Sequence, residues 1–357
     1  MNTLFDKVEL GPLTLPNRIV MAPMGRCRVG RDGTPTDSLV TYYAQRASAG
    51  LIISESTHPS LLSQGHAHCA RIDTPEQVAG WRRVTDAVHA EGGRMFLQIL
   101  HVGRISHPDI HGQVPVAPSP VQADGLAMTY SGRRPFPPPR ALTVPEIDRT
   151  IAEYAAAARK AVQAGFDGVE LHGANGYLPH QFLSTHTNHR TDEYGGSVRN
   201  RIRFTERMVA AVAAEIGPER IGIRLSPGGR INDMREDDVD DVYPELTRIL
   251  AGLGIAYLHL VVGTDQVLAR RLRAEWPGAM ILNPGTGGLG VPETLDIVDQ
   301  HLRDGFDLFS FAKQFLANPD LPERLRTGAE LNRPDIETFY TGGDRGFIDY
   351  PALAKHR

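Results

Sequence analysis

Residues 166–177, FDGVELHGANGY, hold the pattern on which both the fold and the function depend. The apolar run at the start of this stretch predicts a buried strand, and the glycines and polar residues after it predict a loop. The loop presents His172 and Asn175, which can donate hydrogen bonds, and Tyr177, which can release a proton. Two donors and an acid suit a site that binds a carbonyl-type oxygen and protonates an atom nearby. The alternative is a loop whose polar groups only satisfy its own backbone.

Seven further apolar runs of strand length occur along the chain, so eight strands are expected in all. These runs are residues 18–23, 51–56, 94–100, 220–225, 255–260, 279–282 and 306–310. Helical patterns follow nearly all of them, and two of the helices begin with the capping boxes Thr74-Pro75-Glu76-Gln77 and Thr143-Val144-Pro145-Glu146. This alternation predicts an α/β fold, a (β/α)8 TIM barrel that forms a single domain over residues 1–357, with an N-terminal hairpin near residues 8–15.

Two other architectures are compatible with the length of 357 residues. One is a pair of ordinary domains. The other is a doubly wound sheet, which usually shows a glycine-rich dinucleotide turn after its first strand. Here Pro23-Met24-Gly25-Arg26 stands at that place, which favours the barrel.

The stretch from about residue 101 to 142 interrupts the alternation after the third strand. It is rich in proline and glycine, and residues 135–139 read PFPPP. Long irregular segments of this kind are lids over functional sites or linkers between domains. Because the strand–helix alternation resumes unchanged afterwards, we expect a lid.

Composition excludes several classes of function. The formal net charge of −4 gives no reason to expect a nucleic-acid partner, and no apolar run reaches the length that spans a membrane. The two cysteines, Cys27 and Cys69, form no disulfide framework, and no secretory signal is present, so a cytoplasmic location is expected. The clusters His66-Ala67-His68-Cys69 and His186-Thr187-Asn188-His189 match no zinc spacing, so no metal site is expected.

In a TIM barrel the active site lies at the carboxyl ends of the strands, which would bring distant residues together. Arg224 comes near the end of the fifth strand, where it is either a fixed cation facing a ligand or a partner in an internal ion pair with Glu170 or Glu55. The glycine-rich residues 283–288 (NPGTGG) after the seventh strand and Lys313 after the eighth suggest a phosphate site. The alternative is a flexible turn and a solvated surface charge.

Ordered motifs over nearly the whole chain resemble the old yellow enzyme family of flavin-dependent ene-reductases. They are residues 13–23 (LTLPNRIVMAP), 42–55 (YYAQRASAGLIISE), 101–104 (HVGR), 172–184 (HGANGYLPHQFLS), 190–197 (RTDEYGGS), 317–321 (ANPDL), 339–340 (FY) and 349–351 (DYP), with Gln98 in a matching strand. The resemblance implies non-covalent FMN at the carboxyl end of the barrel. It also implies a ping-pong reaction in which NADPH or NADH reduces FMN, after which the C=C bond of an α,β-unsaturated carbonyl compound, a small-molecule activated alkene, is reduced.

The same resemblance implies roles for individual residues. His172 and Asn175 would bind the substrate oxygen, and Tyr177 would protonate the α-carbon. Gln98 and Arg224 would contact the polar edge of the flavin ring, where a cation stabilises the anionic reduced form. The other FMN contacts would be Pro23, Met24, Gly25 and Ser56 along the ring and Gly285, Ala312 and Lys313 around the phosphate. The substrate contacts would include Leu100 and Tyr340.

Three positions depart from the family pattern. Gly25 stands where the family often has a hydroxyl or thiol that bonds the flavin, so the flavin potential should be more negative. Leu100 replaces a frequent tryptophan, which reshapes the substrate pocket, and Lys313 replaces an arginine, which leaves a point charge instead of a bidentate fork.

Three hypotheses about function follow. The first is an NAD(P)H-dependent ene-reductase, acting as a monomer or homodimer. The second is a specialised desaturase or redox-neutral isomerase that uses a flavin of lower potential. The third is a flavin-binding protein without turnover, against which the intact set of His172, Asn175 and Tyr177 speaks.

Overall fold

The computed structural model describes residues 3–261, 266–283 and 295–354 of the chain. Eight parallel strands close into a barrel in which the spatial order follows the order along the chain. The strands are β3 (Ile19–Met21), β4 (Leu51–Ile53), β5 (Met95–Ile99), β10 (Gly168–His172), β11 (Ile221–Leu225), β12 (Tyr257–Val261), β13 (Ala279–Asn283) and β14 (Leu308–Phe311). The predicted TIM barrel is confirmed, and its closure excludes the doubly wound sheet.

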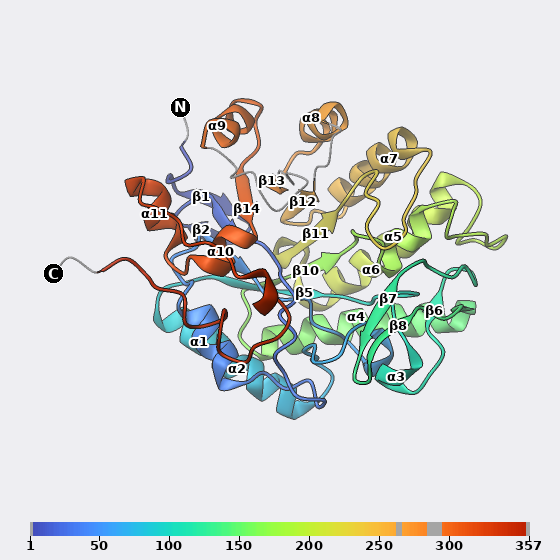
Figure 1. Cartoon of the computed structure of the whole chain (residues 1–357). Coiled ribbons are helices and arrows are strands. Elements are labelled where there is room, and N and C mark those ends of the chain that lie inside the picture. The colour runs from blue at the N-terminus through green and yellow to red at the C-terminus, as the bar shows by residue number, and fades with distance from the viewer. Residues whose placement is uncertain (1–2, 262–265, 284–294, 355–357) are drawn as a thin grey trace.

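Helices surround the barrel, as Figure 1 shows. The longer ones are α1 (Asp37–Ala44), α2 (Pro75–Ala90), α4 (Val144–Gln163), α6 (Val198–Ile216), α7 (Val239–Gly252), α8 (Gln266–Glu275) and α9 (Leu295–Arg303), and the shorter ones near the site are α5 (Leu178–Leu183), α10 (Lys313–Ala317) and α11 (Leu321–Thr327). Both predicted capping boxes are present, with Thr74 and Gln77 at the start of α2 and Thr143 and Glu146 at the start of α4. No helix in these described ranges is long and apolar enough to cross a membrane.

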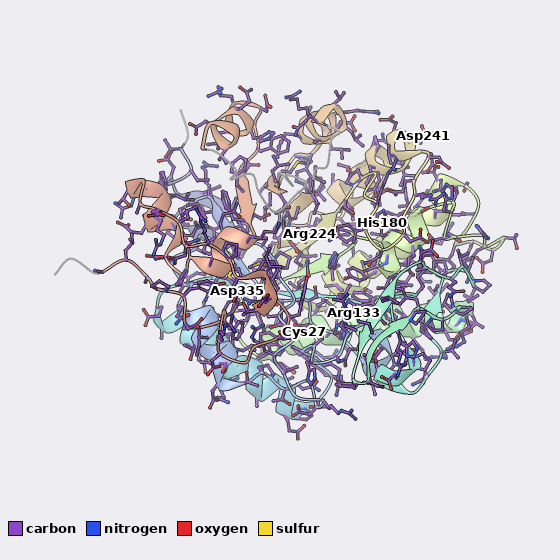
Figure 2. The ribbon with its side chains drawn as sticks, viewed as in Figure 1. Cys27, Arg133, His180, Arg224, Asp241 and Asp335 are labelled. Carbon is purple, nitrogen blue, oxygen red and sulfur yellow. The ribbon has the colours of Figure 1, made fainter. Side chains whose placement is uncertain are left out.

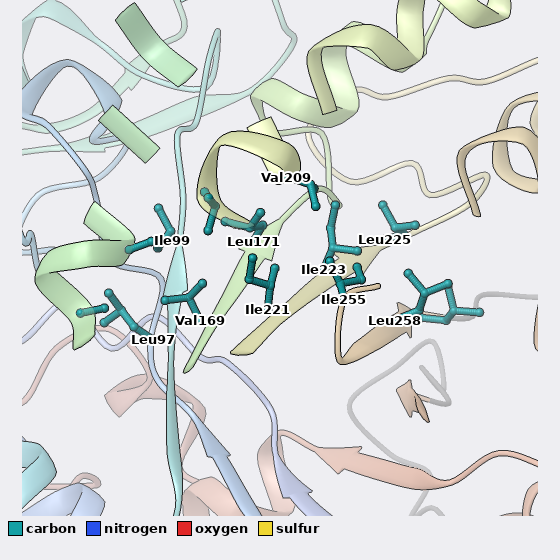
Figure 3. Close-up of a cluster of buried hydrophobic side chains, with 14 of the residues drawn as sticks. Leu97, Ile99, Val169, Leu171, Val209, Ile221, Ile223, Leu225, Ile255 and Leu258 are labelled. Atoms are coloured by element: carbon teal, nitrogen blue, oxygen red, sulfur yellow. The ribbon is translucent and has the colours of Figure 1, made fainter. Parts of the chain in front are cut away.

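The strands alternate between side chains that face the helices and side chains that face the barrel interior. Val169 and Leu171 on β10 belong to the same apolar cluster as Ile221 and Ile223 on β11 and Val209 on α6, as the close-up in Figure 3 shows. Since side chains along a strand alternate, the intervening positions point into the barrel. Those positions are Glu170 and His172 on β10, Gly222 and Arg224 on β11, and Phe96 and Gln98 on β5.

The amino-terminal end of the barrel is closed by apolar packing. The predicted hairpin is present as β1 (Val8–Leu10) and β2 (Leu13–Leu15), which pair antiparallel. Leu10 and Leu15 pack in one cluster with Val20, Phe96 and Tyr257 from the barrel strands. Gly222 makes room for this filling, because a Cβ there would lie 2.0 Å from the Tyr257 ring. The polar interior positions are therefore concentrated toward the carboxyl end.

The segment between β5 and α4, for which we predicted a lid, is more regular than expected. Within residues 101–142 the structure has α3 (Pro108–His111), the parallel pair β6 (Val116–Ala117) and β9 (Arg140–Ala141), and a hairpin of β7 (Leu126–Thr129) and β8 (Gly132–Pro135). The expectation of an irregular stretch was wrong here. All four residues of β8 are exposed, so this strand has no apolar alternation that a sequence pattern would reveal.

Candidate active site

A cavity of about 310 Å³ lies at the carboxyl ends of the barrel strands. It is lined by Pro23, Met24, Gly25, Arg26, Ser56, Gln98, His172, Asn175, Tyr177, Arg224, Ala312, Lys313, Leu316, Phe339 and Tyr340. These residues come from six of the eight strand ends and from the C-terminal segment. Closure of the barrel thus gathers residues that are more than three hundred positions apart, in the place where TIM barrels hold their ligands.

Two predicted site residues fall elsewhere. Gly285 lies outside the described residues. Leu100 is not among the described residues that line the cavity; it packs in a small apolar cluster with Val102 and Phe136, against which Tyr177 rests. The role of Leu100 toward the substrate therefore stays a prediction; what the structure shows is that Leu100 belongs to the cluster on which Tyr177 packs.

His172 ends β10 and presents one particular tautomer to the cavity. The backbone N–H of Ala174 donates to His172 Nδ1 over 3.3 Å, so Nδ1 must carry a lone pair. Burial, together with the positive charge of Arg224, lowers the pKa of His172 well below its usual value. The ring is therefore neutral with its proton on Nε2, which makes Nε2–H a hydrogen-bond donor.

The loop after β10 sets Asn175 beside this ring. Asn175 has a φ of 55°, and its backbone is held by Ser226 Oγ, which accepts from its N–H over 2.8 Å, and by Asn232 Nδ2, which donates to its carbonyl over 2.8 Å. Its side-chain Oδ1 is buried and has no hydrogen-bond partner among the described residues. A fixed backbone with a buried amide oxygen left unpaired indicates that the amide of Asn175 is not committed to another group of the described residues.

Tyr177 completes this wall of the cavity. Its ring meets that of His172 edge-on, with the ring centroids 5.0 Å apart and the planes at 79°. Burial raises the pKa of Tyr177 to about 12, so the hydroxyl keeps its proton at neutral pH. Two neutral donors and a protonated acid therefore occupy one side of the cavity.

A second support lies behind the loop. The N–H of Gly176 donates to His180 Nδ1 over 3.0 Å, and His180 Nε2 lies 3.0 Å from Glu236 Oε2. The Tyr243 hydroxyl donates to Glu236 as well. Because Gly176 sits between Asn175 and Tyr177, this buried network, formed by His180 on α5, Glu236 before α7 and Tyr243 on α7, holds the backbone that carries both side chains.

The opposite side of the cavity rests on a buried polar chain inside the barrel. Gln98 Nε2 donates to Glu170 Oε1 over 2.8 Å, and Ser56 Oγ donates to Gln98 Oε1. The amide of Gln98 is thus oriented with its nitrogen toward Glu170 and its oxygen toward Ser56, another residue of the cavity wall. A ligand N–H that reaches this wall would find Gln98 Oε1 as an acceptor.

Glu170 is the charged centre of this chain. Its other oxygen accepts from His259 Nδ1 over 2.7 Å, and His259 Nε2 lies 2.8 Å from Ser310 Oγ. Burial opposes ionisation, but the neighbouring His259 and Arg224 lower the pKa of Glu170 below its usual value. Burial also lowers the pKa of His259, so the pair consists of a carboxylate and a neutral ring.

Arg224 brings a cation to the same layer. It is the register partner of His172 on β10 and of His259 on β12. Its Nε is buried without a hydrogen-bond partner within the described ranges, and no ion pair of Arg224 is found there. Of the two roles left open by the sequence, this geometry favours a cation that faces a ligand, balanced at a distance by Glu170.

Three lining residues, Arg26, Leu316 and Phe339, were not predicted. Arg26 Nη2 donates to the carbonyl of Gly346 over 2.8 Å and its Nε to that of Phe339 over 3.0 Å, so it ties the C-terminal segment to the cavity. These residues lie beyond the strand ends themselves, and no strand-end pattern points to them.

The two histidine-rich clusters serve local packing. His68 Nδ1 is bonded to the Val29 carbonyl over 2.9 Å, and His186 Nε2 to Asp237 over 2.8 Å. Among the described residues, no group of three or more His, Cys, Asp or Glu side chains is placed to hold a metal ion.

Comparisons with known proteins agree with this geometry. A family model described as the NADH:flavin oxidoreductase / NADH oxidase family matches residues 3–332. The chain is 42% identical to a probable flavin mononucleotide-dependent alkene reductase of Leishmania infantum, over 99% of this chain and 98% of that protein.

Solved structures give the same result. The old yellow enzyme homologue from Zymomonas mobilis superposes with a TM-score of 0.95 at 42% identity, covering 99% of this chain and 100% of that one. Morphinone reductase in complex with tetrahydroNAD superposes with a TM-score of 0.94 at 43% identity and covers 99% of both chains.

Proposed function

The chain belongs to the NADH:flavin oxidoreductase / NADH oxidase family, the family of old yellow enzyme, and from this we propose that it is an FMN-dependent ene-reductase. It reduces the C=C bond of α,β-unsaturated carbonyl compounds with electrons from NAD(P)H. The observation that carries the proposal is the single cavity in which His172, Asn175 and Tyr177 face the same space as Gln98 and Arg224.

The residues of the cavity suit FMN. The volume of the cavity, about 310 Å³, lies at the lower end of the range for small-molecule sites. The unpaired Nε of Arg224 is a buried donor that a ligand acceptor would satisfy. Gln98 and Arg224 would hold the polar edge of the ring, Pro23, Met24, Gly25 and Ser56 its flank, and Gly285, Ala312 and Lys313 the phosphate.

When bound, FMN supplies the hydride chemistry that no side chain of the protein can perform. The protein residues bind, orient and protonate the alkene substrate. His172 Nε2–H and the Asn175 amide donate hydrogen bonds to its carbonyl oxygen, which draws electron density from the conjugated C=C bond. Because both donors are neutral, they polarise the carbonyl without surrendering a proton to it.

Tyr177 delivers the proton that completes the reduction. Its hydroxyl proton passes to the α-carbon of the substrate, and the resulting phenolate is reprotonated from solvent. A pKa of about 12 keeps Tyr177 protonated between turnovers, so the acid is always ready.

We also propose the finer properties of the enzyme. The hydride donor, NADPH or NADH, and the alkene use the one cavity in turn, which corresponds to a ping-pong order. Leu100 and Tyr340 shape the substrate side of this cavity. The presence of two free thiols supports a cytoplasmic location, and the enzyme acts there as a monomer or homodimer.

An anaerobic two-step experiment tests the proposal. NADPH is added to the purified yellow protein, and the loss of flavin absorbance is followed; cyclohexenone is then added. Bleaching, followed by reoxidation with formation of cyclohexanone, is the expected result. A purified protein that carries no flavin and takes up none from solution would refute the proposal.

One observation favours a second function, desaturation of a saturated ketone. Gly25 offers no hydroxyl to the flavin, and a Cβ built there meets nothing within 4 Å, so the space for such a group is present but unfilled by the protein. Slow bleaching by NADPH together with oxidation of cyclohexanone under oxygen would support this function over the first.

A further inference from the structure

The fold brings together the only two cysteines of the sequence. Cys27 lies in the loop after β3, and Cys69 lies in the segment between the short helix η1 (Leu61–Ser63) and α2. Although 42 positions separate them, their Sγ atoms are 3.9 Å apart and both are free thiols. A disulfide needs an S–S distance of about 2.05 Å, so the two sulfur atoms must move closer together for the bond to form.

Backbone contacts hold the two cysteine-bearing segments side by side. The N–H of Val29 donates to the carbonyl of His68 over 3.3 Å, and His68 Nδ1 is bonded to the carbonyl of Val29 over 2.9 Å. The backbone of Cys27 is in the left-handed region with a φ of 53°, which is uncommon for a residue other than glycine. The pairing of the thiols is therefore imposed by the surrounding structure.

The two thiols differ in access. Cys27 is partly exposed and lines a second cavity of about 350 Å³, which shares Tyr340 with the active-site cavity. Cys69 is buried, and its hydrogen bond to Cys27, followed by burial, raises its pKa well above the usual value. A small oxidant would thus meet Cys27 first, with the protonated Cys69 placed behind it as the resolving thiol.

The pair also connects to the substrate side of the active site. The segment with Cys69 contacts the lid hairpin, because the N–H of Ala67 donates to the carbonyl of Met128 over 2.9 Å and the ring of His68 meets that of Tyr130 at 5.2 Å. On the other side, Cys27 follows two residues after Gly25, which lines the active-site cavity. A covalent bond between the thiols would join the segment that contacts the lid hairpin to a loop that lines that cavity.

We propose that Cys27 and Cys69 (Cys27 is labelled in Figure 2) form a redox-active dithiol that hydrogen peroxide converts to an intramolecular disulfide. In this reaction each thiol loses its hydrogen, the S–S bond forms, the O–O bond of the peroxide breaks, and two molecules of water leave. An added dithiol such as dithiothreitol reverses the oxidation. The effect of the bond on alkene binding rests on the proposed function, whereas the thiol chemistry does not.

Thiol counting and mass spectrometry on the full-length flavoprotein test the chemistry. The reduced protein is treated with one equivalent of hydrogen peroxide and then denatured, and its free thiols are counted. The expected result is a fall from two thiols to none, a mass loss of two hydrogen atoms, a linked peptide that contains both cysteines, and full reversal by dithiothreitol. Oxygen addition to Cys27 without a linked peptide, or a dimer joined between chains, would overturn the proposal.

Single variants provide the matched controls. Cys27→Ser and Cys69→Ser should each keep flavin absorbance and thermal midpoint close to the wild type, and neither should form the intramolecular link.

In the wild type, oxidation should change KM for cyclohexenone severalfold and reversibly, with no such change in oxidised Cys69→Ser. If the disulfide forms but KM is unchanged, the redox-active dithiol is confirmed and its effect on alkene binding is refuted. If the protein reduces no alkene at all, the proposed function fails while the thiol result remains valid.

Discussion

Glu170 and Gln98 are register partners on adjacent strands of the barrel and share a hydrogen bond of 2.8 Å in its fully buried interior. Through this bond Glu170, which does not itself line the cavity, orients the Gln98 amide, which does. The same carboxylate lies close enough to Arg224 to counter the depression of the arginine pKa by burial. Figure 2 shows Arg224 near the centre of the barrel. The charge of Glu170 thus supports two residues that face the ligand, Gln98 and Arg224.

Glu170→Gln should lower the free energy of unfolding by about 3 kcal/mol, because it leaves Arg224 as a buried charge without compensation. Urea unfolding of the flavin-loaded and flavin-free proteins would measure this loss. The matched control is Glu206→Gln, which removes a surface pair with Arg199 and should cost less than about 1 kcal/mol. Equal losses in the two variants would contradict the role assigned to Glu170.

Tyr177→Phe should slow alkene reduction by about 10²–10⁴-fold, because it removes the positioned proton donor. Bleaching of the flavin by NADPH should change little, since no proton from Tyr177 is needed in that step. Stopped-flow absorbance can follow the two half-reactions separately. An equal loss of rate in both half-reactions would mean that the substitution disturbs the cavity as a whole, and it would contradict the role of Tyr177 as the acid.

The alkene half-reaction should be nearly independent of pH between about pH 6 and 9. His172 has a lowered pKa, so it gains a proton only as the pH falls well below this window. Tyr177 has a pKa raised to about 12, so it loses its proton only as the pH rises well above the window. A break near pH 6.5 that disappears in His172→Asn would mean that the histidine works as a cation.

Gly25→Thr should raise the reduction potential of bound FMN, because it adds a hydroxyl donor next to the ring. The substitution is sterically open, since a Cβ at Gly25 meets no atom within 4 Å and the backbone there is not in the left-handed region. Gly25→Ala is the control that adds the Cβ without a donor, and it should leave the potential unchanged. A redox titration with a reference dye measures both, and a shift of equal size in the two variants would refute the account of this position.

The strands and most helices were predictable because they depend on local patterns. Eight apolar runs of four to seven residues and two capping boxes all correspond to elements of the structure. Helix α1 is an exception: the pattern of residues 39–49 predicts a helix as far as Ala49, but α1 ends at Ala44, because residues 45–49 continue as turns with hydrogen bonds three residues apart. The short helices α5 and α10 and the lid hairpin were missed, since they are too brief or too exposed to show a period.

The loop of His172, Asn175 and Tyr177 separates what the sequence predicts from what only the folded structure shows. The sequence by itself determined the alternation of strands and helices, and with it the barrel and the end at which these side chains emerge, because strand and helix periods are properties of neighbouring residues. Only the tertiary structure decided that His172 presents Nε2–H, that Glu170 orients Gln98, and that Cys27 meets Cys69. Tautomers, buried charge partners and thiol pairs depend on contacts between strands and loops far apart in the chain, and such contacts exist only once the barrel has closed.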